Sequence, residues 1–358
     1  MRSRRVRFLA TAGFIAVIVT MFFAAGCTSE ENEGSEPTTA APITIPDLVP
    51  EQSPDAQRPV SDQVWPAILA LHIEVDPVDV ASQPADLALV DGSMYLVDTG
   101  HGRLVEVSAD GQDFRPLDAS LDSRLALETP MAIASLEEQL YVANSGAGEV
   151  VITDTAGVVS DVISLAKASS SDALSPRPIG IAVWDDGAFA VSDANNNRLT
   201  KYSPEGDVLW SVGTGSPASG EEGFNVPGGL ALDNDGNVYV VDILNAQVKK
   251  YSAEGSFLAA FGESGDTAGR FSRAKALAVD DAGNIYVSDG LGAAIQVFSP
   301  AGAYQGLVGR QDPTDENSDS LFEAPHGVKI SDGKLYVVDR YAGIFVFDLP
   351  DLQSGAGA

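Results

Sequence analysis

The stretch PGGLALDNDGNVYVVDILNAQVKKY, residues 227–251, shows the pattern on which the fold prediction rests. Three short runs, 227–232, 238–242 and 247–251, contain Val, Leu and Tyr, and the segments DNDGN and ILNA separate them. Short runs of this kind are typical of strands, and Asp-Gly pairs between such runs favour tight hairpin turns. The stretch therefore predicts consecutive strands joined by hairpins.

The DNDG run at 233–236 also has the acidic composition of a calcium-binding loop. An EF-hand-like loop needs further spaced ligands and a Glu at its end, whereas a strand-like run follows here at once. Asp and Gly recur at the same place in other parts of the chain, where a first strand must fold back on a second. Because these residues tolerate the backbone of a tight turn, we interpret the run as a hairpin.

The whole pattern recurs six times at a mean spacing of about 48 residues. The copies begin with PADLAL at 84, PMAIAS at 130, PIGIAV at 178, PGGLAL at 227, AKALAV at 274 and PHGVKI at 325. Three or four short strands per repeat at this spacing are typical of a β-propeller. We predict an all-β fold, a six-bladed β-propeller spanning residues 66–350.

The ring needs a closing strand, because the sixth repeat ends in GIFVFDLPDLQ without a fourth strand-like run. A strand-like run, AILALHIEV at 67–75, precedes the first repeat and has no unit of its own. If this run completes the last blade, no sheet edge stays open. We therefore expect an N-terminal strand to close the propeller.

The recurring motifs resemble the NHL repeat over roughly residues 84–348. They are the P-x-G-I/L-A start, the Y-V-x-D core, the linker in DANNNRL, and a Phe three residues before the next start, at Phe224, Phe271 and Phe322. The resemblance implies a six-bladed NHL-type propeller. NHL domains commonly serve as binding or scaffold modules without catalysis, so it also implies such a role.

The N-terminus has the composition of an export signal. A basic segment, MRSRRVRF, precedes the apolar segment LATAGFIAVIVTMFFAAG and Cys27, the only cysteine. We predict a signal peptide over 1–26. AAGC at 24–27 resembles the lipobox of bacterial lipoproteins, which implies a lipid on Cys27 and a place in the bacterial cell envelope, extracytoplasmic and anchored to the membrane. A plain transmembrane anchor remains the alternative.

The flanking segments and the charge restrict the partners. Residues 27–65 are rich in Pro, Thr, Ser and acids, which predicts a disordered tether, and residues 351–358 read as a flexible tail. The net charge is -30, so nucleic acid is excluded as a partner by repulsion between like charges. A protein, a peptide or a small anionic ligand fits the remaining possibilities.

Propeller geometry indicates which face carries function. The loops between second and third strands share one face with the long blade-to-blade loops, at 117–129, 165–177, 213–226, 262–273 and 309–324. Binding residues usually lie on such loops. An Asp recurs at the end of the second strand on this face, and we interpret it as a structural loop cap. These caps are Asp98, Asp193, Asp242, Asp289 and Asp339.

The residues that break the repeat suggest a ligand site. Six basic residues are expected near this face in the fifth and sixth repeats: Arg270, Arg273, Lys275, Arg310, His326 and Arg340. Guanidinium groups grip carboxylates well, so the group is a candidate site for an anionic ligand or an acidic peptide. The alternative is a set of solvated side chains that neutralise neighbouring acids.

Catalysis has weaker support. The amidating lyases are six-bladed relatives with zinc-binding histidines after Pro in alternate blades, but only His326 stands at such a position here. In gluconolactonase-like propellers, central carboxylates and an Asn hold a divalent cation, but the inner-strand starts supply only Asp86. We therefore predict no catalytic residue, metal ligand or cofactor. A lactonase-like hydrolase or amidating-lyase-like lyase that uses Ca or Zn stays the alternative.

Overall fold

The computed structural model describes residues 65–76, 81–117, 119–165, 174–311 and 318–350. The predicted signal peptide, Cys27, nearly all of the predicted tether and the predicted tail lie outside the described residues. Within the described ranges, no helix has both the length and the apolar character needed to cross a bilayer.

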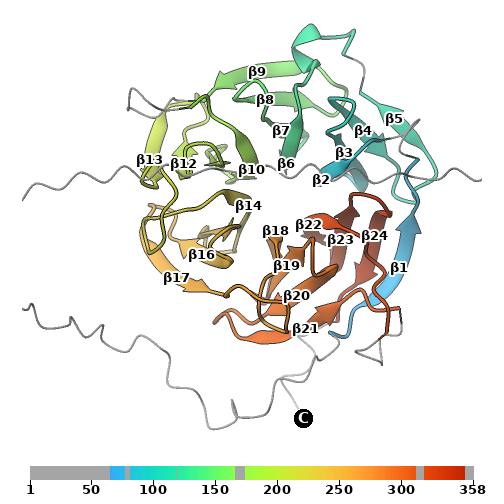
Figure 1. Cartoon of the computed structure of the whole chain (residues 1–358). Helices are drawn as coiled ribbons and strands as arrows, with labels where there is room; N and C mark the ends of the chain where they lie inside the picture. Colours follow the sequence, from blue (N-terminus) through green and yellow to red (C-terminus); the bar gives the residue numbers. More distant parts are fainter. Residues whose placement is uncertain (1–64, 77–80, 118, 166–173, 312–317, 351–358) are drawn as a thin grey trace, which may run out of the picture. The chain divides into compact units, whose positions relative to one another are not determined.

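The described strands form six antiparallel sheets of four strands each, arranged in a ring (Figure 1). Blades 1–3 contain β2 Pro84–Val90, β3 Ser93–Asp98, β4 Arg103–Val107 and β5 Phe114–Pro116; β6 Pro130–Leu136, β7 Gln139–Asn144, β8 Glu149–Asp154 and β9 Val159–Ser164; β10 Pro178–Val183, β11 Phe189–Asp193, β12 Arg198–Tyr202 and β13 Val208–Val212. Blades 4–6 contain β14 Pro227–Leu232, β15 Val238–Asp242, β16 Gln247–Tyr251 and β17 Phe257–Phe261; β18 Ala274–Val279, β19 Ile285–Asp289, β20 Ala294–Phe298 and β21 Tyr304–Val308; β22 Pro325–Ser331, β23 Lys334–Asp339, β24 Gly343–Asp348 and β1 Ile68–Ile73. The predicted six-bladed β-propeller is confirmed.

The N-terminal strand closes the ring as predicted. Strand β1 pairs antiparallel with β24, from Ile68 opposite Asp348 to Ile73 opposite Ile344. In Figure 1 the blue β1 lies beside the red β24, although the two are far apart in the sequence. Strand β1 is therefore the outer strand of blade 6, and the first described strand of the chain completes the last blade.

The core lies between neighbouring blades. The faces of adjacent sheets pack through alternating apolar residues, for example Val97 of β3 with Val142 of β7, both fully buried. The Phe residues that precede the last three repeats belong to this packing, since Phe224, Phe271 and Phe322 are at most 4% exposed. Burial of such a side chain contributes about 1.5–3 kcal/mol, which gives the recurring Phe a structural role.

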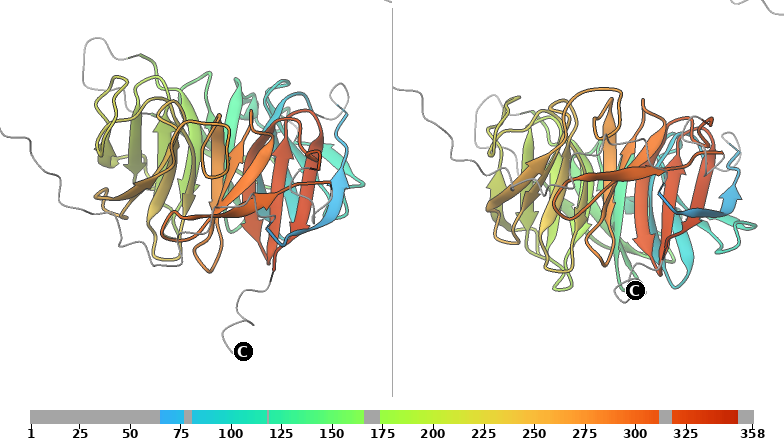
Figure 2. Two further views of the ribbon diagram at one scale, coloured as in Figure 1. Left: turned by 60° about the horizontal axis from the view of Figure 1, so that its bottom comes forward. Right: turned by 90° about the horizontal axis from the view of Figure 1, so that it is seen from below.

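The connections gather on two faces of the ring, seen edge-on in Figure 2. We call the face with the hairpins between first and second strands the turn face; its turns are 91–92, 137–138, 184–188, 233–237, 280–284 and 332–333. The opposite face, with the connections between second and third strands and between blades, is the loop face. The DNDG run lies on the turn face, where Asp233 Oδ1 accepts the N–H groups of Asp235 and Asn237.

The six inner strands line a central channel and approach one another closely at their third residue. That residue is small in five blades, and the sixth is Asp86. A Cβ at Gly180 would lie 2.3 Å from Gly228 O, and one at Gly229 would lie 2.7 Å from Ala276 Cα. Small residues therefore allow the strands to converge, which makes a waist in the channel.

Candidate functional site

The recurring Asp side chains of the loop face accept hydrogen bonds from the loops around them. Asp339 accepts the N–H groups of Glu323, Ala324, Tyr341 and Ala342. Asp98 accepts from the Ser82 N–H, from both the N–H and the ring Nδ1 of His101, and from Arg103 Nε. Asp193, Asp242 and Asp289 make comparable sets of bonds. Because backbone groups hold these carboxylates, we interpret them as loop caps.

In blade 4 the capping Asp also pairs with a buried lysine, which the sequence interpretation missed. Lys249 Nζ lies 2.8 Å from Asp242 Oδ2, and the two side chains are 1% and 0% exposed. The same ammonium donates to the carbonyl of Gly220, at 2.8 Å, and to that of Gly223. It also lies 4.9 Å from the ring centre of Phe224. Lys249 thus ties the long loop before blade 4 to the sheet.

Four of the six predicted basic residues come together at the loop-face end of the channel. Lys275 follows the first residue of β18, His326 follows the first residue of β22, and Arg340 follows β23. Burial lowers the pKa of Lys275, and the nearby charges of Arg273 and Arg340 lower it further. We call these four residues the cationic mouth.

His326 is held neutral within the cationic mouth. Its Nδ1 lies 2.8 Å from the carbonyl oxygen of Ala85, across the boundary between blades 6 and 1. Burial lowers the pKa of His326 to about 3, and the charges of Arg340 and Lys275 act in the same direction. The other two histidines lie elsewhere, since His101 contacts Asp98 and His72 stacks on Phe345 of β24 in blade 6.

No acid forms an ion pair with the cationic mouth among the described residues. None of its four side chains belongs to an ion pair in this part of the chain, and the buried Arg340 Nε has no hydrogen-bond partner there. Asp289 is the nearby carboxylate, and it already accepts from the N–H groups of Ser272, Arg273 and Gly292. The mouth therefore has unused donors, and the charge of Asp289 compensates only part of its positive charge.

The remaining two predicted residues do not join the mouth. Arg270 Nη2 lies 2.9 Å from Glu263 Oε1 in an exposed pair. Arg310 Nη1 donates to the carbonyl of Ser318, at 3.2 Å. Both residues line a separate cavity of about 200 Å³ together with Gln296 of β20. The single basic group expected from the sequence is thus divided in two.

An arc of exposed apolar residues lies on the same face in blades 4–6. Leu244, Leu291 and Tyr341 are 56%, 68% and 67% exposed. Each stands two residues after the capping Asp of its blade, where blades 1–3 have Gly100, Gly146 and Asn195. Three equivalent positions in consecutive blades therefore present large apolar groups to solvent, which we call the apolar arc.

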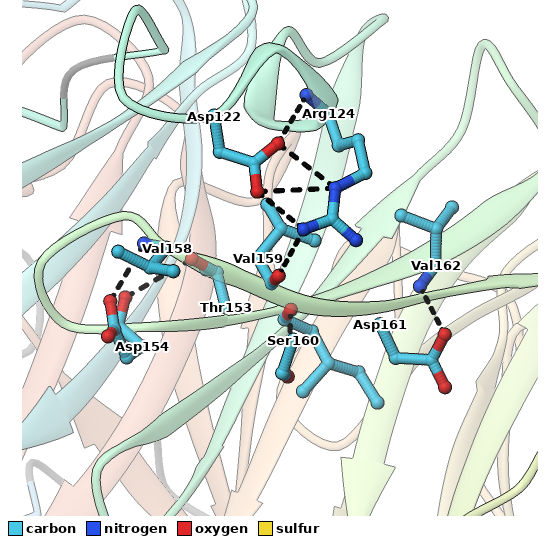
Figure 3. A network of polar contacts seen from close by, with 10 residues as sticks. Asp122, Arg124, Thr153, Asp154, Val158, Val159, Ser160, Asp161 and Val162 are labelled. Atoms are coloured by element: carbon cyan, nitrogen blue, oxygen red, sulfur yellow. Dashed lines mark hydrogen bonds and ion pairs between the residues drawn. The ribbon is translucent and has the colours of Figure 1, made fainter.

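Figure 3 shows how the connection between blades 1 and 2, at residues 119–129, is attached to the outer strand of blade 2. Asp122 caps the short helix η2, Ser123–Leu125, by accepting the Arg124 N–H. The Arg124 guanidinium grips the same carboxylate and also donates to the Val159 carbonyl of β9 at 2.5 Å. These bonds lower the pKa of Asp122 to about 2. The network fixes the loop to blade 2 and leaves no free cation there.

The channel beneath the cationic mouth is almost filled. The cavity there measures only about 20 Å³, because Met131, Ile179, Lys275 and His326 surround it. Beyond the waist the channel widens to about 290 Å³ and opens toward the turn face. A ligand of the cationic mouth would therefore bind at the surface of the protein. The wider part of the channel opens on the turn face, where the sequence interpretation had placed only tight turns.

Comparison with known protein families identifies the relationship. The sequence model described as the SMP-30/Gluconolactonase/LRE-like region matches residues 90–309, more than half of the chain. The chain belongs to the SMP-30/gluconolactonase/LRE-like family. The finer likeness of its repeats to the NHL type remains an interpretation of the motifs. No curated protein matches the sequence.

Solved structures similar to this SMP-30/gluconolactonase/LRE-like chain agree on the fold. A gluconolactonase from Xanthomonas campestris is 14% identical, with a TM-score of 0.56, and the match covers 80% of this chain and 99% of that one. A streptogramin B lyase is 13% identical, with a TM-score of 0.55, and 80% and 100% are covered. An auxiliary nutrient binding protein from Bacteroides thetaiotaomicron is 12% identical, with a TM-score of 0.58, and 78% and 75% are covered. At these identities the similarity shows the fold alone.

The divalent cation associated with gluconolactonase-like members of this family does not fit the described residues. No three His, Cys, Asp or Glu side chains in the described ranges are grouped to hold a metal. Asp86, the carboxylate at the waist, lies 3.2 Å from Lys329 Nζ and accepts the Ile133 N–H. Toward the loop face, Asp86 lines the same small cavity as Lys275 and His326 of the cationic mouth. Positive charges at this position oppose a bound cation.

Proposed function

We propose that this family member is a lipid-anchored, extracytoplasmic propeller that binds an acidic segment of a protein partner on the loop face of blades 4–6. The observation that carries the proposal is the cationic mouth, where Lys275, Arg273 and Arg340 form no ion pair among the described residues. The lipid on Cys27 and the bacterial envelope location rest on the N-terminal sequence.

Charge supports an acidic partner. The chain carries 51 acidic and 21 basic residues, so a cluster of basic side chains that form no ion pairs is unexpected on its folded domain. A surface of this kind costs stability through repulsion unless an anion compensates it. Guanidinium and ammonium groups form strong, charge-assisted hydrogen bonds with carboxylates. The free donors of the mouth match the carboxylates of Glu or Asp side chains.

The apolar arc supports a protein partner over a small ion. Leu244, Leu291 and Tyr341 surround the same half of the loop face, and protein interfaces combine apolar anchors with polar groups that give specificity. The cavity under the mouth holds only about 20 Å³, which leaves little room for an enclosed substrate. A peptide with acidic and apolar side chains would use both features at once.

The second candidate is a lactonase-like hydrolase, which family membership favours. The channel residue that would take part is Asp86, the carboxylate nearest the waist. Calorimetry with Ca²⁺ and Zn²⁺ and a lactone-hydrolysis assay test this candidate. Metal binding and turnover that are both lost in Asp86→Asn would favour catalysis over the binding role.

A fluorescent peptide tests the binding role. The full chain, purified in detergent, is titrated against a short peptide rich in Glu and Leu, and fluorescence anisotropy reports the affinity. We expect the double variant Lys275→Gln/Arg340→Gln to weaken binding by about tenfold or more, because two charge-assisted contacts are lost. The Gln-for-Glu version of the peptide should bind poorly to the unchanged protein.

A charge-matched variant controls for net charge. Arg115→Gln/Lys334→Gln removes the same number of positive charges from exposed ion pairs outside the mouth. This variant should retain the affinity for the peptide. Equal loss in both variants, or no loss in either, would reject the cationic mouth as the site. Free glutamate binding as tightly as the peptide would instead support a small anionic ligand.

A further inference from the structure

The wide end of the central channel is a second cavity, which we call the turn-face funnel. It measures about 290 Å³ and opens on the face opposite the cationic mouth. Residues from all six inner strands line it, among them Ala134, Ala231, Leu232, Val279, Lys329 and Ile330. The waist separates it from the mouth, so it is a site of its own.

The fifth residue of each inner strand explains the shape and the charge of the funnel. The fifth residue of the inner strand is alanine in five blades, at Ala88, Ala134, Ala182, Ala231 and Ala278, and Lys329 in blade 6. Methyl groups leave the space near the axis empty. A closed cavity of roughly 150 Å³ holds benzene, so the larger funnel, although open to solvent and lined by polar backbone atoms as well as apolar side chains, has the volume for a small ring with a substituent.

Among the described residues, Lys329 is the single charged side chain that lines the funnel. Its ammonium lies 3.2 Å from Asp86 Oδ2 of blade 1, and the two side chains are 24% and 10% exposed. Asp86 is also the exception at its own position, because the third inner-strand residue is Gly or Ala in the other five blades. Two exceptions to the repeat therefore meet across the junction where the ring closes.

The hydrogen bonds of this pair are incomplete. An ammonium has three N–H donors, and the Asp86 carboxylate is the one partner that Lys329 Nζ has among the described residues. Asp86 Oδ2 is shared with the Ile133 N–H, whereas the buried Oδ1 has no partner in that part of the chain. Unused donors of a largely buried ammonium at the base of a cavity with mostly apolar side chains favour a ligand that supplies an acceptor oxygen.

We propose that the turn-face funnel binds a small, mainly apolar molecule with one oxygen acceptor group, such as a carbonyl or a carboxylate. The apolar body occupies the space above the alanine ring, and the acceptor receives a hydrogen bond from Lys329. A ligand with an ammonium group offers no acceptor to the Lys329 donors. A ligand with several negative charges finds just one cation, and Asp86 already neutralises it.

Three matched probes test the proposal on the full chain: phenylacetamide, phenylacetate and protonated phenethylamine. Saturation-transfer NMR detects contact and calorimetry measures affinity. We expect one or both of the oxygen acceptors to bind and the ammonium probe to bind at least about tenfold more weakly. The preference between amide and carboxylate shows whether the head group is neutral or charged.

Two variants locate the binding. Lys329→Met removes the donor, and Ala231→Leu fills the funnel without touching the ion pair; each should weaken the acceptor probes by about tenfold. The loop-face variant Lys275→Met should leave their affinity unchanged, so failure of the acidic-peptide proposal would not affect this result. No binding of either acceptor probe, equal binding of the ammonium probe, or full binding by Ala231→Leu would overturn the proposal.

Discussion

The two ends of the central channel are built from the same six strands, yet they differ in shape and charge. At the loop-face end, Lys275 and His326 fill the space and leave about 20 Å³, with positive charge exposed to solvent. At the turn-face end, a ring of alanines leaves about 290 Å³, and the lysine there is paired with Asp86. Residues that break the repeat, three positions apart on the inner strand, decide the chemistry of each end.

The comparison also separates scaffold from site. On the loop face the repeated Asp residues are saturated with hydrogen bonds, whereas the unrepeated Lys275 and Arg340 have unused donors. A polar group whose bonding is complete stabilises the fold, and one with spare capacity is available to a ligand. The predictions below test this division, beginning with the largest expected effect.

Loss of the buried lysine of blade 4 should cost the most stability. Lys249→Met leaves the fully buried Asp242 without its cation, and breaking a buried pair in this way costs about 3–5 kcal/mol. Urea unfolding followed by fluorescence measures the change in the free energy of unfolding. Lys250→Met is the control. It should lower the free energy of unfolding by less, because Lys250, the partner of Asp233, is more exposed than Lys249. Equal stability of Lys249→Met and the unchanged protein would contradict a scaffold role.

Loss of the channel ion pair should have an intermediate effect. Lys329→Met leaves Asp86 buried without an ionic partner, and we expect a loss of about 1–3 kcal/mol in the free energy of unfolding. The double variant Asp86→Ala/Lys329→Met should recover part of this loss, because no unpaired charge remains. Additive losses in this double-mutant cycle would show that the two groups do not interact.

The charge of the cationic mouth should be visible in the titration of His326. The pKa of His326 is about 3, against an ordinary value of 6.5, so the folded protein binds fewer protons than the unfolded chain between these values. This group therefore stabilises the fold above pH 6.5, and its contribution is lost as the pH falls toward 3. Arg340→Gln removes a repelling charge and should raise the pKa of His326 in NMR titrations. A lower or unchanged value would place Arg340 outside the mouth.

The smallest effect is expected at the exposed loop network of blades 1 and 2. The pKa of Asp122 is about 2 because Arg124 holds its carboxylate. The stability from this contact is present above the ordinary carboxyl pKa and is lost as the pH falls toward 2. Arg124→Gln should return the pKa of Asp122 toward its ordinary value, as measured by carbon-detected NMR. Titration of Asp122 at the same pH in both proteins would rule out the network.

Most of the fold was predictable because it depends on local and repeated signals. Asp-Gly turns such as 235–236 and short runs rich in Val and Tyr such as 238–242 specify structure over a few residues, and the pattern is repeated six times. The closing strand followed from counting, since one strand was missing at the end and one was unassigned at the start. The grouping of basic residues was predictable in part: of the six that were expected together, the structure brings together Arg273, Lys275, His326 and Arg340.

Other features required distances that the sequence does not contain. The separation of Arg270 and Arg310 from the mouth depends on how two loops turn, and the burial of Lys249 depends on a loop more than 20 residues earlier in the chain. Asp86 and Lys329 meet through closure of the ring, across 243 positions of the chain. The alternating pattern and the repeat thus determine strands, turns and blade number from the sequence alone. The tertiary structure decides which charges meet and which end of the channel stays hollow, because both depend on the packing of inner strands from different blades.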